Sequence, residues 1–319
     1  MSHAVATVAT VTDSGVIDSE VAGGEQPATV PIRSLLAPFR YGGGDPTTRL
    51  SAHEFVRATL TPDGPGTLHL RWRPSGREVE VDAWGAGGPW MRASADALLG
   101  RWDEPVVFER AHPLILRAQH RHPGLRLGGS GDLYHELLPT ILGQRITAGE
   151  AVRQWRWLCE RLGDPAPGPF PGLLLPPDPS RLVRMPSWWF HPLGIERKRA
   201  EPLIEVARHA DKLWGWAGLG AAGAATALSR LRGVGEWTIG LVLAIALGEP
   251  DAIAVGDYHL KNFVAWNLAG EPRGTDERML ELLAPYRGQR GRVVRLLQCE
   301  GQGAPSFGPR QRILPMRRW

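Results

Sequence analysis

Cysteine, lysine and long apolar runs are all scarce in this sequence of 319 residues. Its two cysteines, Cys159 and Cys299, are too few for a disulfide framework or a cysteine-ligated cluster. There is no run of about 18 apolar residues, the length that a membrane-spanning helix needs. The N-terminus also lacks the charged-then-apolar pattern of a secretory signal. We therefore expect a reduced, cytoplasmic protein that does not bind a membrane.

The basic residues are strongly biased toward arginine. Lysine occurs three times, at Lys198, Lys212 and Lys261, against 34 arginines, and the net charge is +4. Arginine suits two-point contacts with phosphate, so the composition is compatible with nucleic-acid binding. Codon bias would also explain it, because Gly, Pro and Ala are abundant too. The modest net charge argues against a structural DNA-bending protein.

The first 110 residues predict a disordered segment followed by a small α+β domain. Residues 1–28 are small and polar with no sustained period, which is typical of disorder. Within 29–110, apolar and polar side chains alternate over Thr67–Arg73 and again over Glu78–Trp84, with Pro-Ser-Gly at 74–76 between them. This pattern predicts a hairpin in a half-exposed antiparallel sheet.

The rest of the chain is predicted to be helical. A short helix capped by Ser94 is expected over Ser94–Trp102, and residues 111–300 are expected to form a helical domain. Eight prolines within 164–186 predict a connector rather than a regular element. Residues 301–319 form a basic tail with four arginines and no acidic residue. The helices expected between are Leu133–Leu142, Ala148–Leu162, Glu196–Trp214, Ala222–Leu231, Glu236–Leu247, Asp257–Leu268, Glu277–Leu283 and Gln289–Gln298.

The most informative motif is a pair of glycines around one apolar residue, in Leu231-Arg232-Gly233-Val234-Gly235-Glu236-Trp237-Thr238. We interpret it as a helix, a tight turn and a second helix. The glycines let the backbone turn sharply and leave amide N–H groups uncovered, and such groups at the start of a helix bind phosphate well. The alternative is a C-cap glycine between two packed helices, since Gly-x-Gly turns are common.

A carboxylate follows this turn. Asp257 lies 22 residues after Gly235, in Val255-Gly256-Asp257-Tyr258, at the expected start of the next helix. Asp is a preferred N-cap residue, and a helix N-terminus favours its ionised form. A phosphate site followed by a lone carboxylate predicts chemistry on a nucleic acid.

Two further segments extend the pattern, Leu142-Gly143-Gln144-Arg145-Ile146-Thr147 and Leu193-Gly194-Ile195-Glu196-Arg197-Lys198-Arg199-Ala200. With these four segments in order, the chain resembles the helix-hairpin-helix DNA glycosylase superfamily and, within it, the bacterial 3-methyladenine DNA glycosylase II group. The resemblance implies a mainly α fold with two helical lobes and a smaller N-terminal α+β domain containing an antiparallel sheet. It also implies a monomer that acts on double-stranded DNA with damaged bases, associated with the nucleoid in a bacterium.

The resemblance assigns a role to each motif. It implies that Gly233, Val234, Gly235 and Thr238 hold DNA phosphate at the hairpin, independently of base sequence. The hairpin carbonyls are also implied to bind a monovalent cation, while no other cofactor is expected. The catalytic carboxylate is implied to be Asp257, which stabilises positive charge on the deoxyribose and orients or deprotonates the attacking water.

Further residues are implied to handle a base that is flipped out of the duplex. Gln144 and Arg145 belong to the segment that fills the gap, with Gln144 expected at the opposite strand. Arg145 stands where well-known relatives have leucine; it either stacks in the gap or contacts phosphate. Trp237 and Tyr258 are implied to line the base pocket, where aromatic faces attract a cationic base. Core packing is the alternative for both.

The chain departs from the family in its aromatic residues. Two aromatic pocket positions of the relatives fall on Leu241 and Leu297. The cluster Trp188, Trp189 and Phe190 could supply a compensating face, although an apolar cluster after prolines is more often core.

The chain also departs from its strand-cleaving relatives. They carry a lysine nucleophile where this chain has Trp237, and none of the lysines lies in the hairpin. Lys261, one turn beyond Asp257, is expected to contact phosphate or solvent. The four-cysteine cluster of some relatives is absent, since only Cys299 follows Asp257, and the ten histidines show no metal-ligand spacing, so no metal site is expected.

Together these features predict a monofunctional DNA glycosylase of base-excision repair. It would hydrolyse the N-glycosidic bond of alkylated purines such as 3-methyladenine and leave an abasic site. The alternatives are a glycosylase for a different damaged base and a non-catalytic protein that binds damaged DNA. Asp257 argues against the non-catalytic alternative, because a binding protein gains little from a carboxylate that faces an anionic duplex.

Overall fold

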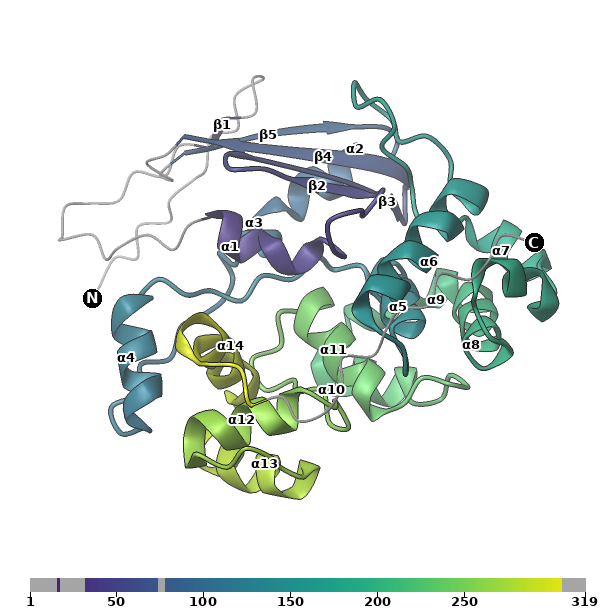
Figure 1. Cartoon of the computed structure of the whole chain (residues 1–319). Helices are drawn as coiled ribbons and strands as arrows, with labels where there is room; N and C mark the ends of the chain where they lie inside the picture. The colour runs from purple at the N-terminus through teal and green to yellow at the C-terminus, as the bar shows by residue number, and fades with distance from the viewer. Residues whose placement is uncertain (1–15, 18–31, 74–77, 306–319) are drawn as a thin grey trace.

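The computed structural model describes residues 16–17, 32–73 and 78–305, which form one antiparallel sheet beside a larger helical body (Figure 1). The strand order in the sheet is β1-β5-β4-β3-β2, and every neighbouring pair is antiparallel. The strands are Val16–Ile17 (β1), Thr48–Leu50 (β2), Glu54–Thr61 (β3), Gly64–Trp72 (β4) and Val79–Trp84 (β5).

The predicted hairpin is confirmed, because β4 and β5 pair with Trp72 opposite Val79. Its turn at 74–76 lies outside the described residues. The expectation of a half-exposed sheet is wrong for the central strands: β3 and β4 are buried along most of their length. Short helices cover one face of these strands, and Leu173 and Leu175 pack on the other.

The helices on the first face are α1 (Ile32–Leu36), α2 (Gly88–Ala93) and α3 (Ala95–Leu98), together with the 3₁₀ turn η1 (Ala37–Phe39). The short helix expected over Ser94–Trp102 is present as α3 but ends at Leu98, and the predicted cap by the Ser94 side chain is wrong. Ser94 is a junction between α2 and α3, and its hydroxyl donates to the Trp90 carbonyl at 2.9 Å instead of capping the following helix.

The proline-rich segment is ordered and covers the sheet. Pro165 bridges to Leu174, and the Leu173 and Leu175 side chains that follow pack against Val56 and Ala58 of β3. Contrary to expectation, the segment contains a regular helix, α7 (Pro179–Arg184). A proline is tolerated there because it occupies the first helical turn, where its missing N–H would have no partner in the helix.

The larger part of the chain is helical, which confirms the mainly α fold class with a small antiparallel sheet. Its helices are α4 (Pro113–Arg121), α5 (Leu133–Leu142), α6 (Ala148–Leu162), α8 (Arg197–Arg208), α9 (Ala210–Ala217), α10 (Gly220–Leu228), α11 (Glu236–Ala246), α12 (Leu260–Ala269), α13 (Asp276–Leu283) and α14 (Arg290–Glu300), with 3₁₀ segments η2 (Ser187–Leu193) and η3 (Ala284–Tyr286). The bounds of α5 and α6 are those predicted. The helix expected over Glu196–Trp214 is instead two helices, which divide at His209.

Two hydrophobic cores organise these helices. One gathers side chains from α5, α6, α8, α9, α10 and α11, and the other gathers side chains from α4, α12, α13 and α14. Figure 1 shows the second group gathered away from α5, α6 and α8, with α11 between the two groups. The loop from α11 to α12 links the two cores, and this loop carries Asp257.

Several expectations concern residues at the ends of the chain. Of the segment 1–28, only Val16–Ile17 is described, and it pairs with β5. The tail beyond residue 305 lies outside the described residues. The domain boundary near residue 110 stays a prediction. None of the helices in the described ranges combines the length and apolar character needed to cross a membrane.

Candidate active site

The glycine turn joins α10 to α11, and each glycine has its own reason to be there. Gly233 has a φ of +84°, and a Cβ at this position would lie 2.2 Å from the Pro202 ring, so both backbone and space require glycine. Gly235 has open space around it instead. Val234 between them is buried in the helical core, so only its backbone is available to DNA.

The first turn of α11 presents backbone donors. The first intrahelical hydrogen bond runs from Ile239 N–H to the Gly235 carbonyl at 2.9 Å, so the N–H groups of residues 236–238 precede the helical ladder. Together with the turn before them, they form the kind of helix N-terminus that binds an anion. The implied phosphate site at this turn remains a prediction.

The side chains of Thr238 and Gln144 hold the turn in place. Thr238 is only 1% exposed, and its hydroxyl accepts a hydrogen bond from Gln144 Nε2 at 3.0 Å. The same nitrogen donates to the Gly233 carbonyl at 3.0 Å. The Thr238 hydroxyl and the Gln144 amide thus bind each other and the turn. Their roles in DNA binding stay predictions.

Arg145 follows Gln144 in a strained turn. Its φ of +58° is the one left-handed value at a non-glycine residue in the described ranges, and its side chain is exposed. Beneath the turn, the buried Arg199 guanidinium donates to the Leu142 carbonyl at 3.1 Å and to the Gly194 carbonyl at 3.0 Å. This network ties α8 to the end of α5, so the surrounding structure holds Arg145 in a conformation that it would not adopt freely.

Asp257 is held by three donors. Its Oδ1 accepts from the N–H groups of His259 and Leu260, both at 2.8 Å, and its Oδ2 accepts from Trp237 Nε1 at 3.0 Å. The helix expected to start at Asp257 starts at Leu260, so this carboxylate caps the turn before α12. The three bonds fix the rotamer of the carboxylate without neutralising its charge.

The loop that carries Asp257 packs closely on α11. A Cβ at Gly240 would lie 2.1 Å from the carbonyl oxygen of Ile253, so only glycine allows this contact. The close approach places Asp257 within hydrogen-bonding distance of Trp237, near the start of α11. Residues far apart in the sequence thus meet at one carboxylate.

A cavity of about 830 Å³ opens beside Asp257. Its walls come from α1 and η1, the 122–128 segment, α11, the α11–α12 loop, α12 and α14. Leu241 lies in the wall, and the aromatic side chains of the wall are Phe39, His122, His259 and Phe263. Charged residues from several elements also line it, namely Arg33, Arg126, Glu249, Asp257 and Arg295.

The two aromatic residues predicted for the base pocket lie elsewhere. Trp237 is partly buried and acts on Asp257 through its indole N–H, but it is not among the residues lining the cavity. Tyr258 is 72% exposed, packs edge-on against the His259 ring, and is also outside the cavity wall. Their roles in base binding stay predictions.

The other candidate aromatic and aliphatic residues are part of the core or the surface. Leu297 and Phe190 are fully buried in the hydrophobic cores, and Trp188 is 68% exposed. Trp189 packs edge-on against Phe190. No residue of η2 lines this cavity, so a compensating aromatic face from residues 188–190 has no support in its walls and stays a prediction.

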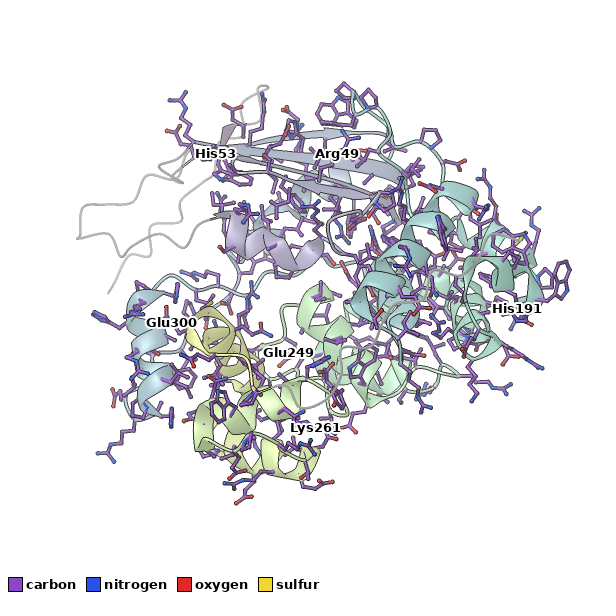
Figure 2. All side chains as sticks on the ribbon, in the orientation of Figure 1. Arg49, His53, His191, Glu249, Lys261 and Glu300 are labelled. Carbon is purple, nitrogen blue, oxygen red and sulfur yellow. The ribbon has the colours of Figure 1, made fainter. Side chains whose placement is uncertain are left out.

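Lys261 has a protein partner. Its Nζ lies 3.1 Å from Asp276 Oδ2, and Figure 2 shows it on α12. The expected contact with phosphate or solvent is thus replaced by an ion pair with α13. In the part of the chain that the structure describes, no group of three His, Cys, Asp or Glu side chains gathers in a way that could hold a metal ion.

Sequence analysis did not identify Phe39, Phe263 or Glu249 as site residues. Phe39 lies more than 200 positions before Asp257, in an element that also packs on the sheet. No local pattern distinguishes Phe263 from a core residue of α12. Glu249 follows Leu247-Gly248 after α11, and only the closing of the loop brings it to the cavity wall.

Comparisons with known proteins identify two relatives by sequence. No family model matches the chain. The chain is 25% identical to the DNA-3-methyladenine glycosylase of Bacillus subtilis (strain 168) over 212 residues, which cover 62% of this chain and 69% of that protein. It is 29% identical to DNA-3-methyladenine glycosylase 2 of Escherichia coli (strain K12) over 143 residues, which cover 44% of this chain and half of that protein.

The fold is also similar to a solved structure. The 3-methyladenine DNA-glycosylase from Archaeoglobus fulgidus superposes with a TM-score of 0.66 at 19% identity, covering 84% of this chain and 93% of that one. At this level of identity the likeness concerns the fold, and the chemistry has to be argued from the site.

Proposed function

We propose that this chain belongs to the 3-methyladenine DNA glycosylase II group of the helix-hairpin-helix DNA glycosylases and removes alkylated purines from DNA. Its similarity to two DNA-3-methyladenine glycosylases supports this proposal. The observation that carries the proposal is Asp257, a carboxylate held by three N–H donors on the wall of a cavity of about 830 Å³. A cavity of this size has room for a flipped purine.

In the proposed reaction, the bond between C1′ of the deoxyribose and the purine nitrogen breaks. The purine leaves with the bonding electron pair, which neutralises the positive charge that alkylation placed on it. The sugar passes through an oxocarbenium-like state, and the Asp257 carboxylate stabilises that charge. A water molecule then adds its oxygen to C1′ and gives up one proton, with Asp257 orienting it or accepting the proton, and an abasic site remains.

The duplex is proposed to lie across the glycine turn at Gly233 and the turn at Arg145. Backbone N–H groups at the start of α11 bind a phosphate near Gly235. Arg145, exposed and next to the same turn through Gln144, fills the space that the flipped base leaves. The carbonyls of Leu231 and Gly233 each accept one hydrogen bond already, and each keeps a second lone pair for a monovalent cation.

Strand cleavage is not part of the proposal. A lyase step needs an amine that attacks C1′ and forms a Schiff base. No lysine is among the described residues that line the cavity, and the lysine nearest in sequence to Asp257, Lys261, is paired with Asp276. We therefore propose simple hydrolysis.

Base release from methylated duplex DNA tests the proposal. The wild-type protein is expected to release 3-methyladenine, detected by chromatography, and to leave strands that break only after alkali. Asp257→Asn keeps the size of the side chain and an oxygen for the His259 and Leu260 N–H groups, but it removes the negative charge. We expect base release to fall on the order of a hundredfold or more, with binding to damaged duplex retained.

Three results would overturn parts of this proposal. Wild-type protein that binds methylated DNA without releasing any base would indicate a binding protein or a different lesion. Release at an unchanged rate by Asp257→Asn would remove that residue from catalysis. Strand breaks without alkali would show a lyase step. Unfolding midpoints of both proteins serve as the control for folding.

A further inference from the structure

The loop from α11 to α12 brings a second carboxylate to the cavity. Glu249 and Asp257 both line it, and both belong to this one loop, so the wall that the loop forms carries two negative charges. Figure 2 shows Glu249 between α11 and α14. The hydrolytic mechanism above uses Asp257 and leaves Glu249 without a role.

Glu249 is held in place by its backbone surroundings. Its own N–H donates to the Leu243 carbonyl at 3.3 Å, and its Oε1 accepts from the Asp251 N–H at 3.2 Å. These bonds keep the residue at the end of α11 and restrict its side chain. Its carboxylate is nonetheless not neutralised: across residues 32–73 and 78–305, no Lys, Arg or His nitrogen lies within 4.0 Å of it.

Its neighbour in the same loop provides a contrast. Asp251 pairs with the Arg290 guanidinium at 2.6 and 2.8 Å and also accepts from the Gly288 N–H at 2.8 Å. Asp251 thus anchors the start of α14. Two residues earlier, Glu249 makes no such ion pair and lines the cavity instead. A partly buried carboxylate without a counter-charge is costly, and such groups are found where a ligand supplies the missing charge.

The aromatic residues predicted to attract a cationic base do not line the cavity, whose aromatic side chains are instead Phe39, Phe263, His122 and His259. Leu241, which lines it, is aliphatic, and Trp237 and Tyr258 lie outside its wall. A fixed carboxylate can distinguish alkylated purines from undamaged ones by charge. N-alkylation gives the purine a positive charge that the undamaged base lacks. We propose that Glu249 is a specificity-determining residue that selects cationic, N-alkylated purines over neutral ones.

Three arginines line the cavity from other walls: Arg33 of α1, Arg126 of the 122–128 segment and Arg295 of α14. Arg295 of α14 donates to the Ser34 carbonyl at 3.0 Å, and Arg126 donates to the Asp103 carbonyl. These bonds direct their guanidinium groups to α1 and to the segment before α4. The wall built by the α11–α12 loop carries both carboxylates that line the cavity, Glu249 and Asp257. In the proposal, the base enters with its positive charge toward that wall.

This inference rests on the proposed function, so it needs a measurement that does not depend on catalysis. The first measurement is the binding of 3,9-dimethyladeninium, a permanently cationic base analogue, against neutral 9-methyladenine, each titrated with the full-length protein. The wild type is expected to prefer the cation, and Glu249→Gln to reduce that preference about tenfold. Asp257→Asn is expected to retain a preference for the cation.

The second measurement is single-turnover release of 3-methyladenine from methylated duplex. Glu249→Gln is expected to slow release about tenfold, with an unfolding midpoint near that of the wild type. Glu104→Gln is the matched control, because it removes one negative charge at an exposed position on a different cavity and is expected to change neither measurement.

The outcomes separate the two proposals. If the wild type shows no preference for the cationic analogue, or if Glu249→Gln keeps that preference in full, Glu249 does not select for charge. If the preference disappears in Glu249→Gln while the wild type releases no methylated base, the charge selection holds and the proposed reaction fails. Equal loss of affinity for both analogues would assign Glu249 a structural role only.

Discussion

Charged side chains are enclosed in two regions of the molecule, the junction between the sheet and α5 and the cavity at Asp257. The two regions differ in whether a carboxylate has a charged partner. At the junction, Arg57 of β3 lies 2.6 Å from Glu136 of α5, and the two side chains are 2% and 7% exposed. Arg57 also donates to the Phe39 carbonyl at 2.7 Å. At the cavity, Asp257 is held only by N–H groups, and the carboxylates keep their charge unpaired.

Burial is the main cause of the pKa shifts at the junction. Burial raises the pKa of Asp132 and of Glu136, and the Arg57 guanidinium offsets part of the rise. Burial also lowers the pKa of His135, which lies between the hydroxyls of Thr47 and Thr59 at 3.1 and 2.9 Å, and Arg57 lowers it further. Arg57 and Glu136 form an ion pair in this junction, whereas the buried Asp132 accepts hydrogen bonds from the Thr59 hydroxyl and the His135 N–H. The comparison teaches that unpaired charge at the cavity is reserved for what binds there.

The largest expected effect is a loss of stability when the buried ion pair between Arg57 and Glu136 is broken. Arg57→Met leaves Glu136 buried without its counter-charge, so we expect the free energy of unfolding to fall by about 3–5 kcal/mol. Urea denaturation measures this loss. The specific rate of base release by the folded fraction is expected to stay at the wild-type level, since Arg57 does not line the cavity.

A matched control lies on the neighbouring strand. Arg71 of β4 pairs with Glu80 and Asp82, both at 3.0 Å, but is 51% exposed. Arg71→Met is expected to cost less than about 1 kcal/mol, because water screens an exposed pair. If Arg57→Met and Arg71→Met lose similar amounts of unfolding free energy, burial does not make the Arg57–Glu136 pair more important for stability than the exposed pair.

A smaller effect is expected from removing one of the hydrogen bonds that hold the Asp257 carboxylate. Trp237→Phe keeps an aromatic ring but removes the N–H that donates to Asp257 Oδ2 at 3.0 Å. A hydrogen bond to a charged group contributes about 1.5–3 kcal/mol, so we expect the single-turnover rate of base release to fall at least about tenfold. Trp188→Phe, on exposed η2, is the control and should not change the rate. A wild-type rate in Trp237→Phe would mean that this bond does not position Asp257.

The smallest effect is expected at the exposed turn. Arg145→Gly removes the side chain while glycine accepts the φ of +58° without strain. Base release from duplex is expected to fall about tenfold, whereas release from single strands stays near wild type, because only a duplex leaves a gap to fill. Arg184→Ala, at an exposed arginine of α7, controls for lost positive charge. Equal loss on both substrates would contradict the gap-filling role and favour a phosphate contact.

Much of the fold was predictable because it depends on local patterns. Apolar residues three and four apart placed α5 and α6 with their observed bounds, and alternation placed the β4–β5 hairpin. The errors arise where local signals compete. Ser94 is a residue type that often caps helices, but its hydroxyl donates to the Trp90 carbonyl and makes no cap hydrogen bond to α3. The break at His209 interrupts a pattern that continues through it in the sequence.

The site was predictable in its motifs and less so in its cavity. Asp257, the glycine turn and the Gln144 segment do lie together, linked by Trp237 and by the Gln144 amide. Which aromatic residues face the cavity could not be predicted, since Tyr258 and Phe263 belong to the same short stretch and only Phe263 lines it. A side chain's direction depends on the helix start, and α12 begins three residues after Asp257.

By itself, the sequence determined the elements that rest on backbone chemistry: the sharp turn at Gly233, the N-terminus of α11 and the carboxylate before α12. Glycine, helix periodicity and capping act within a few residues of the chain, so their signals are local. Only the tertiary structure decided what surrounds that carboxylate. Phe39, Glu249 and Arg295 reach one cavity from three distant segments, and long-range packing brings such segments together without leaving a pattern in any one of them.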